Sequence, residues 1–309
     1  MFRKVLLIPA SADVEQPAAR RALELTAAAN GTEIEIFDPV YEPTLEGYFG
    51  NREIYEPLRA RLVDDRLTDA RALAAALEAR GRRATAEALW AHPLDRAVAD
   101  RAARTAADLV VTAPLGDRRG GLSHVDWRLA ATCPVPVLFV RSEAAAPYRR
   151  IVAAVDPTHA HAKPAELDET ILACAKSLAE VGNADVEVLH CVVPLAELGA
   201  APDVDSATLE RLRRTLEEGE RLAVRQLVER AGLPGSSISI VAGRPHAVLE
   251  QKLEAGDADV VVMGALSRGR LKDLLIGSTA EKVLERGRGD VLLVKPSLPG
   301  TRSDEPATG

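Results

Sequence analysis

The sequence is poor in the residues that mark several classes of protein. Aromatic side chains make up only 3% of its 309 residues, so the core has to be built mainly from Leu, Val, Ile and Ala. The three cysteines include no Cys-x-x-Cys pair and are too few for a disulfide framework, which predicts buried thiols in a reducing compartment. No apolar run approaches the roughly 18 residues of a transmembrane helix, so we expect no membrane span.

The first residues have the basic start of a signal peptide without its apolar length. Arg3 and Lys4 precede a short apolar run, but Asp13 and Glu15 interrupt it before the about 7–15 apolar residues that such a segment needs. We therefore expect a cytoplasmic protein.

Basic residues are not in excess in any part of the chain. It has 39 Lys and Arg against 46 Asp and Glu, a net charge of −7, and neither half is basic. Because nucleic-acid-binding domains carry a basic excess, we expect no nucleic-acid partner. At 28% charged and 47% apolar residues, the composition is that of a globular protein.

The chain repeats one alternation of strands and helices twice. Residues 4–8 and 150–155 open the two halves as apolar runs behind basic residues, which is typical of strands buried on both faces. Each half continues through helical patterns with apolar residues three and four apart. The further strands expected are 33–37, 84–89, 107–111 and 135–140 in the first half, and 186–193, 237–241, 258–262 and 290–294 in the second.

Leucines at helical spacing predict a long helix between the second and third strands of each half. In the first half the stripe includes Leu58 and Leu77, and in the second it includes Leu212, Leu216 and Leu227. After each third strand, an x-Pro pair (His92-Pro93 and Arg244-Pro245) places proline in the first turn of a helix, where its missing N–H costs nothing.

This alternation predicts an α/β fold of two tandem, open, twisted parallel sheets with helices on both faces. Two units of about 150 residues fit the length. We expect domains at residues 1–146 and 147–296. Residues 297–309, rich in Pro, Gly, Ser and Thr, are expected to form a disordered tail.

Polar and small residues follow the strands of the second half, where open parallel sheets bind ligands. Asp156 and Pro157 come after the first strand, and Gly264 ends the fourth. Asp156 is expected either to accept hydrogen bonds from a ribose or base or to cap the following turn. Gly264 would let a backbone approach a ligand closely.

A predicted helix N-terminus completes the candidate site. Gly277, Ser278 and Thr279 open an apolar helix and offer N–H groups, hydroxyls and the positive end of the helix dipole to a phosphate. Arg268 adds positive charge nearby. The same residues also match a capping box, in which Ser278 caps the helix and Glu281 follows three residues later. The cap and the phosphate site do not exclude each other, because both use the same geometry.

These motifs resemble those of the universal stress protein family, most closely its tandem E type. The family's Gly-x-x-Gly, nine residues, then Gly-Ser pattern appears here as Gly264-x-x-Ser267, nine residues, then Gly277-Ser278. Asp156 matches the family's Asp after strand one. Asp126-Trp127 and Cys133-Pro134 resemble the E-type first domain. The likeness covers nearly the whole chain outside the tail.

The resemblance implies an adenine-nucleotide site in the second half and none in the first. Asp156 would lie near the base or ribose, and Gly277 and Ser278 at the phosphates of ATP, with Mg. Ser267 departs from the motif, since the family has glycine at this position. Its side chain would narrow the space for the phosphates. In the first half, Ala10 stands where the Asp belongs and Ser123 where the Gly-Ser pair belongs.

The resemblance also predicts how the two halves assemble. Family domains dimerise through their fifth strands, which are bare apolar edges. Within this chain we therefore expect residues 135–140 to pair with 291–294 around a pseudo-two-fold axis.

The expected function is that of a stress-response protein that binds a small molecule and acts through conformation, protein partners or a homodimer, not through turnover. The chain has no P-loop, no Gly-x-Gly-x-x-Gly and no nucleophile elbow. His159 and His161 are expected in a solvated loop rather than at a metal. Two alternatives remain: a module that binds an apolar or acyl ligand beside a vestigial nucleotide site, and a slow ATP hydrolase.

Overall fold

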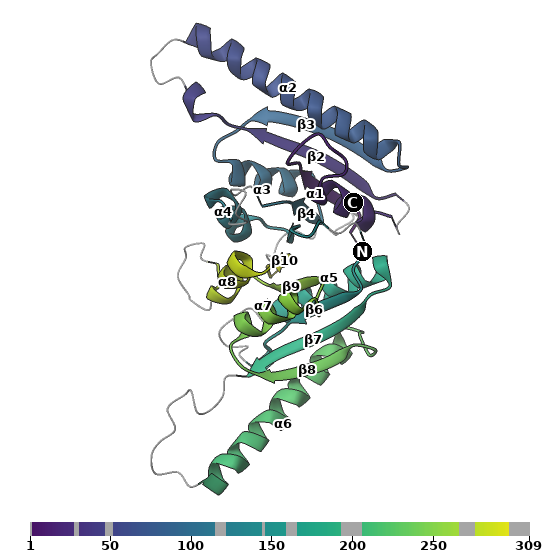
Figure 1. Cartoon of the computed structure of the whole chain (residues 1–309), viewed down its shortest axis with the longest axis vertical. Helices are drawn as coiled ribbons and strands as arrows, with labels where there is room; N and C mark the ends of the chain where they lie inside the picture. Colours follow the sequence, from purple (N-terminus) through teal and green to yellow (C-terminus); the bar gives the residue numbers. More distant parts are fainter. Residues whose placement is uncertain are drawn as a thin grey trace, which may run out of the picture.

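One ten-stranded sheet runs through the whole chain (Figure 1). The computed structural model describes residues 2–27, 31–46, 52–114, 122–143, 146–158, 166–192, 206–265 and 276–296. The strand order is β3-β2-β1-β4-β5-β10-β9-β6-β7-β8. The strands are β1 Lys4–Ile8, β2 Glu33–Val40, β3 Arg83–Trp90, β4 Leu109–Thr112, β5 Val137–Phe139, β6 Arg150–Ala154, β7 Asp185–Val192, β8 Ser237–Ala242, β9 Val260–Gly264 and β10 Asp290–Val294.

Helices alternate with these strands, as the sequence predicts. Within each half all strand pairs are parallel, so each half is a five-stranded open α/β sheet. The helices are α1 Pro17–Leu25, α2 Arg52–Glu78, α3 Leu94–Arg104, α4 His124–Thr132, α5 Leu167–Gly182, α6 Ser206–Arg230, α7 Pro245–Ala255 and α8 Ser278–Arg286, with a 3-10 turn, η1, at Pro43–Leu45.

The helices divide evenly between the two faces of the sheet. Buried residues of α1, α2, α5 and α6 form one apolar cluster with the sheet, and those of α3, α4, α7 and α8 form the other. Each cluster includes residues from both halves, so the core is continuous across the chain. Among the described helices, none is both long and apolar enough to cross a membrane.

The halves join through their last strands. β5 and β10 pair antiparallel, with Val291 opposite Phe139 and Leu293 opposite Val137. All of these side chains are buried. The predicted pairing within the chain is therefore confirmed, and it removes the two apolar edges that each half would otherwise expose.

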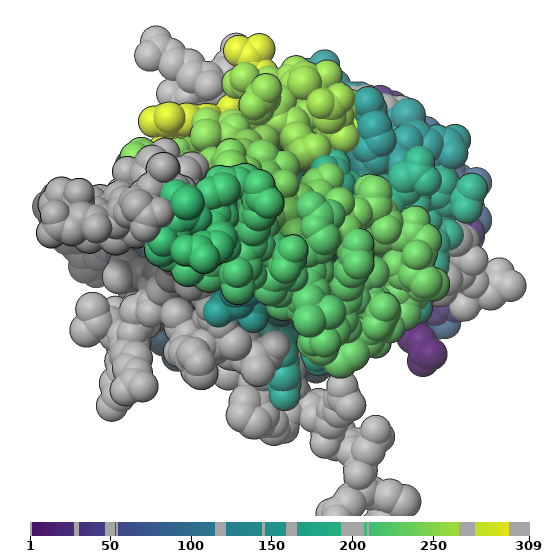
Figure 2. Space-filling model, turned by 90° about the horizontal axis from the view of Figure 1, so that it is seen from below, coloured from purple at the N-terminus to yellow at the C-terminus, as the bar shows by residue number. Residues whose placement is uncertain are grey.

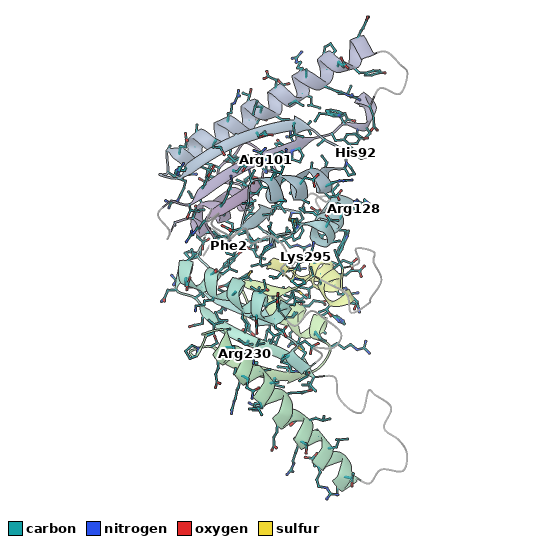
Figure 3. All side chains as sticks on the ribbon, turned by 180° about the vertical axis from the view of Figure 1, so that it is seen from behind. Phe2, His92, Arg101, Arg128, Arg230 and Lys295 are labelled. Atoms are coloured by element: carbon teal, nitrogen blue, oxygen red, sulfur yellow. The ribbon has the colours of Figure 1, made fainter. Side chains whose placement is uncertain are left out.

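Basic residues after β5 and β10 reinforce this junction in corresponding ways. Arg141 donates to the carbonyls of Leu284 and Gly287 at the end of α8, the latter at 2.6 Å. Lys295 donates from Nζ to the carbonyl of Cys133 at the end of α4, at 2.7 Å (Figure 3). Each side chain meets the negative end of a helix in the other half of the chain.

A buried carboxylate lies where the linker, the segment between β5 and β6, meets both halves. Asp290, at the start of β10, accepts from the backbone N–H groups of Arg141 and Ser142, both at 2.8 Å. The hydroxyl of Tyr148 donates to it at 2.6 Å, and the guanidinium of Arg21, from α1, is 3.4 Å away. Asp290 and Arg21 are both buried, so the charges offset one another inside the protein.

The two long helices differ from the expectation, because only their C-terminal parts pack on the sheet. Ala70, Leu73 and Leu77 of α2 are buried, as are Val224 and Leu227 of α6. By contrast, the predicted core leucines nearer the helix starts are exposed: Leu58 at 46%, Leu212 at 45% and Leu216 at 45%. These helices run past the outer strands of the sheet (Figure 1), where no core is available to bury them.

The cysteines and prolines follow the predictions with small differences. Cys133 and Cys174 are free and buried, whereas Cys191 is half-buried. Burial raises the pKa of the Cys174 thiol to about 12. Pro245 begins α7, while Pro93 is the N-cap of α3, one residue before the helix.

Candidate functional site

The predicted site residues of the second half gather at the carboxyl edge of β6 and β9. These strands are neighbours, with Ala153 opposite Val262, so Asp156 and Gly264 follow them at the same edge. β6 continues to β7 on its other side, which makes this the point where strand order reverses and where open sheets bind ligands. The amide of Gly277 donates to the carbonyl of Ala265 at 3.0 Å, which brings the start of α8 to the end of β9.

Asp156 is held by two polar residues that the sequence analysis did not place at the site. Its backbone N–H donates to Oδ1 of Asp168, in the first turn of α5, at 3.2 Å. Its carboxylate lies 3.9 Å from Nδ1 of His190, whose ring also bonds the carbonyl of Val155 at 3.1 Å. His190 and Asp168 are buried, and Pro157 beside Asp156 is half-buried. The sequence feature that could have indicated this role is His190, a histidine within the predicted strand 186–193.

Gly264 has a different reason for being glycine than the one its sequence position suggests. A Cβ built there would lie 2.8 Å from Cδ2 of Leu167. The absent side chain therefore makes room for α5, which packs against the end of β9. The packing of α5 on β9 thus accounts for this glycine without a ligand.

The start of α8 is left without a side-chain cap. Gly277 is the N-cap, with extended backbone angles (φ −64°, ψ 141°) and no side chain to accept from the helix. Ser278 is the first helical residue and Thr279 the second, so the expectation that Ser278 caps the helix is wrong. The first N–H groups of a helix lack partners in the helix itself. No side chain of the described residues caps them, so within that part of the chain they can receive an anion.

The corresponding helix of the first half is capped by its own residues. Ser123 caps α4, accepting from the backbone N–H of Asp126 at 3.1 Å. In return, Oδ2 of Asp126 accepts from the backbone N–H and hydroxyl of Ser123, at 2.7 and 2.8 Å. The buried Asp126 carboxylate takes the place an anion would need, whereas α8 has the small Ala280 at that position.

The first half also lacks the acidic residue after its first strand. Ala10 stands there, and its N–H donates to Oε1 of Gln16 at 2.8 Å. Gln16 is buried and donates back to the carbonyl of Ser11, so a side-chain amide fills the loop. Leu129 is buried, and Leu122 and Trp127 pack against the same cluster, so these three residues belong to the core rather than to a ligand pocket.

Part of the predicted site lies outside the described residues. This applies to Ser267 and Arg268, to the histidine pair His159 and His161, and to the tail 297–309. Within the ranges that are described, no group of three or more His, Cys, Asp or Glu side chains is arranged to hold a metal ion.

A doubly wound α/β fold, repeated twice and joined through its last strands, is the class of protein that the sheet and helices define. The model of the universal stress protein family matches residues 1–141 and 147–295, and the chain belongs to this family.

Relatives of the chain include proteins named universal stress protein E. The chain is 23% identical to universal stress protein E of Photorhabdus laumondii over 300 residues, covering 96% of this chain and 95% of that one. It is 27% identical to the universal stress protein E homolog of Haemophilus influenzae over 173 residues, so that match spans about half (56%) of the relative's length.

Among solved structures, a putative universal stress protein of Pseudomonas aeruginosa UCBPP-PA14 matches with a TM-score of 0.68 and 22% identity. The match covers 96% of this chain and 94% of that one. A functionally unknown protein from Pseudomonas aeruginosa PAO1 matches with a TM-score of 0.69 and 20% identity, over 96% and 93% of the two chains. Both likenesses concern the fold.

Proposed function

We propose that the protein binds one adenine nucleotide in its second domain and acts in the cytoplasm, in stress survival, through binding and conformation rather than turnover. We place the two domains at residues 1–146 and 147–296. The observation that carries the proposal is the contrast between the two helix N-termini: α8 begins at an uncapped glycine, while α4 is closed by Ser123 and Asp126.

The roles follow from where the residues lie. The N–H groups and hydroxyls of Ser278 and Thr279 would receive phosphate oxygens, because the positive end of the α8 dipole favours an anion there. Asp156, fixed through its backbone by Asp168 and beside His190, would accept from the ribose or base. Ser267 and Arg268 would line the phosphate loop. A magnesium ion would accompany the phosphates as part of the bound nucleotide.

Titration calorimetry with MgATP tests the proposal. We expect at most one site per chain, and we expect Gly277→Glu to abolish binding, because a carboxylate would replace the phosphate at the helix start. The matched control is Gly235→Glu, which adds the same charge in the same domain where a new side chain meets nothing within 4 Å. Two equal sites, or a Gly277→Glu variant that still binds, would refute the proposal.

We rank hydrolysis below binding. A nucleoside-facing aspartate and a helix N-terminus stabilise bound ATP but aim no base at an attacking water, and uniform binding lowers no barrier. ATP turnover should therefore stay far below the median enzyme rate of about 10 per second.

A second candidate, an apolar or acyl ligand, is favoured by one observation in the first half. An open surface pocket of about 500 Å³ lies between β2, β3 and α3; it is lined by Phe37, Leu89, Ala97 and Ala103, with Asp100 and Arg104 at the surface. Apolar walls with a few polar groups are typical of small-molecule sites. Native mass spectrometry of the purified protein separates the candidates, because a co-purifying acyl compound and a nucleotide differ in mass.

A further inference from the structure

His190 is a buried ring beside Asp156 that the binding proposed above does not use. It lies in β7 and is 1% exposed. Val186 and Val188, four and two residues before it, pack in the same cluster as α5 and α6, so the alternation of a strand places the ring on this face of the sheet. On the outer side β8 pairs with β7, and α6 packs on both strands. Seen from below, α6 lies at the surface of the molecule in green (Figure 2).

The contacts of the ring fix where its proton lies. Nδ1 of His190 is 3.1 Å from the carbonyl oxygen of Val155, and because a carbonyl only accepts, Nδ1 is the protonated nitrogen of the neutral ring. Nε2 is then an acceptor. It is buried, and within the described part of the chain it has no hydrogen-bond partner. Nε2 can therefore take up a proton without breaking the bond from Nδ1 to Val155.

The charged groups that the described residues bring to this ring are carboxylates. Oδ1 of Asp156 is 3.9 Å from Nδ1, which is too long for a hydrogen bond but close enough for a strong effect of charge. Asp168, from α5, accepts from the backbone N–H of Asp156. The neighbouring strand β8 places the apolar Ile240 opposite His190, and Cys191, next in β7, packs on the other face of the sheet. A positive charge on the ring would thus face Asp156 first.

We infer that His190 is a positioning residue for Asp156 and that protonation of its ring weakens nucleotide binding. Beside a neutral ring, the Asp156 carboxylate accepts from the ribose or base. A protonated ring attracts this carboxylate toward Nδ1, into a charge-assisted hydrogen bond, and so withdraws it from the nucleoside. The inference rests on the nucleotide site proposed above and adds its regulation between about pH 5 and 8, where histidine changes charge.

The same positive charge also attracts the phosphates, but that effect is the smaller one. We place the phosphates at the start of α8, which lies at the end of β9. β7 and β9 lie on either side of β6, so they are about 10 Å apart. At this separation, beyond the Debye length of about 8 Å in physiological salt, the attraction is largely screened, whereas Asp156 is in direct reach of the ring. Acid should therefore weaken binding.

Titration calorimetry of the full chain with MgATP at about pH 8 and about pH 5.5 tests the inference. We expect the dissociation constant of the wild type to rise at least about fivefold at the lower pH. In His190→Asn an amide N–H replaces Nδ1–H beside Val155 but cannot change its charge, so most of the rise should disappear. The matched control is His246→Asn, in α7 of the same domain, which should keep the rise of the wild type.

A second measurement needs no variant. Coupling between two ligands is reciprocal, so a proton on His190 that weakens nucleotide binding is itself displaced when the nucleotide binds. MgATP binding at about pH 6.5, in the middle of the range over which histidine titrates, should therefore release protons. Calorimetry in two buffers of different ionisation enthalpy counts them. A purely structural role of His190 would not produce this release.

Three results would overturn the role of His190 and leave the nucleotide site standing. They are a rise that is equal in the wild type and in His190→Asn, a rise that His246→Asn removes instead, and the absence of proton release. A wild type that binds no MgATP at either pH overturns the nucleotide site, and the role of His190 with it. If His190→Asn does not fold, the proton count in the wild type decides.

Discussion

Removing the carboxylate of Asp290 should destabilise the whole molecule, because this group connects the linker to both halves. Asp290→Ala leaves three donors without their acceptor: the N–H groups of Arg141 and Ser142 and the hydroxyl of Tyr148. It also removes one of the two carboxylates beside the buried guanidinium of Arg21, which keeps its ion pair with Glu24. Burial, with the Asp290 charge, raises the pKa of Tyr148 well above its usual value, so the hydroxyl keeps its proton.

The magnitude follows from burial. A donor left unsatisfied inside a protein costs about 1–3 kcal/mol, and breaking a buried ion pair costs about 3–5 kcal/mol. Because these terms describe one network, they do not add in full. We therefore expect Asp290→Ala to lower the free energy of unfolding by about 4 kcal/mol.

Asp108 provides the control, because it makes similar bonds in the open. It accepts from the backbone N–H groups of Arg3 and Lys4, at 2.7 and 2.9 Å, but is exposed. Water can replace its carboxylate, so Asp108→Ala should cost about 1 kcal/mol or less. Urea unfolding followed by circular dichroism measures both variants. If Asp290→Ala costs no more than Asp108→Ala, the network does not hold the halves together and the reasoning is refuted.

Two other predictions concern a buried acid and a packed glycine. Burial raises the pKa of Asp38 to about 6, so the folded state binds more protons than the unfolded chain between about pH 4 and 6, and ionisation of Asp38 lowers stability as the pH rises through that window. In urea unfolding, the stability of Asp38→Asn relative to the wild type should therefore increase by about 3 kcal/mol between pH 4 and pH 7. A difference between the two proteins that does not change with pH would contradict the raised pKa. Gly264→Ala should lower the free energy of unfolding by about 1–3 kcal/mol, because the added methyl group presses on Leu167. Leu167→Val should recover part of that loss. Strictly additive free energies in the double variant would argue against the contact.

The order of strands and helices could be predicted from the sequence, because strands buried on both faces are short apolar runs. β1 spans Lys4–Ile8, as expected, and β7 and β8 differ from the prediction by about one residue at their ends. The β5–β10 pairing was predicted from the resemblance, because domains of the family dimerise through their apolar fifth strands, and bare apolar edges have to be covered. The resemblance to the universal stress protein family rested on motifs that the family model also matches.

Burial along the long helices was not predictable in this way. Leu212 and Leu227 belong to one apolar pattern, yet one is exposed and the other buried. Helical periodicity tells which residues share a face, but the width of the sheet decides how far that face is covered.

Hydrogen-bond partners distant in the sequence were likewise settled by the tertiary structure. Ser278 followed by Glu281 matches a capping box in sequence, but the helix begins one residue earlier, so the cap falls on Gly277 and the N-terminus stays open. Asp290 is an acid at the start of a strand until Arg21 and Tyr148 are brought to it. The sequence thus determined the order of strands and helices and hence the fold class, because apolar runs and their spacing are local properties. Which helix end is open, which glycine makes room for a neighbour and which acid is paired depend on groups that meet only when the chain is folded.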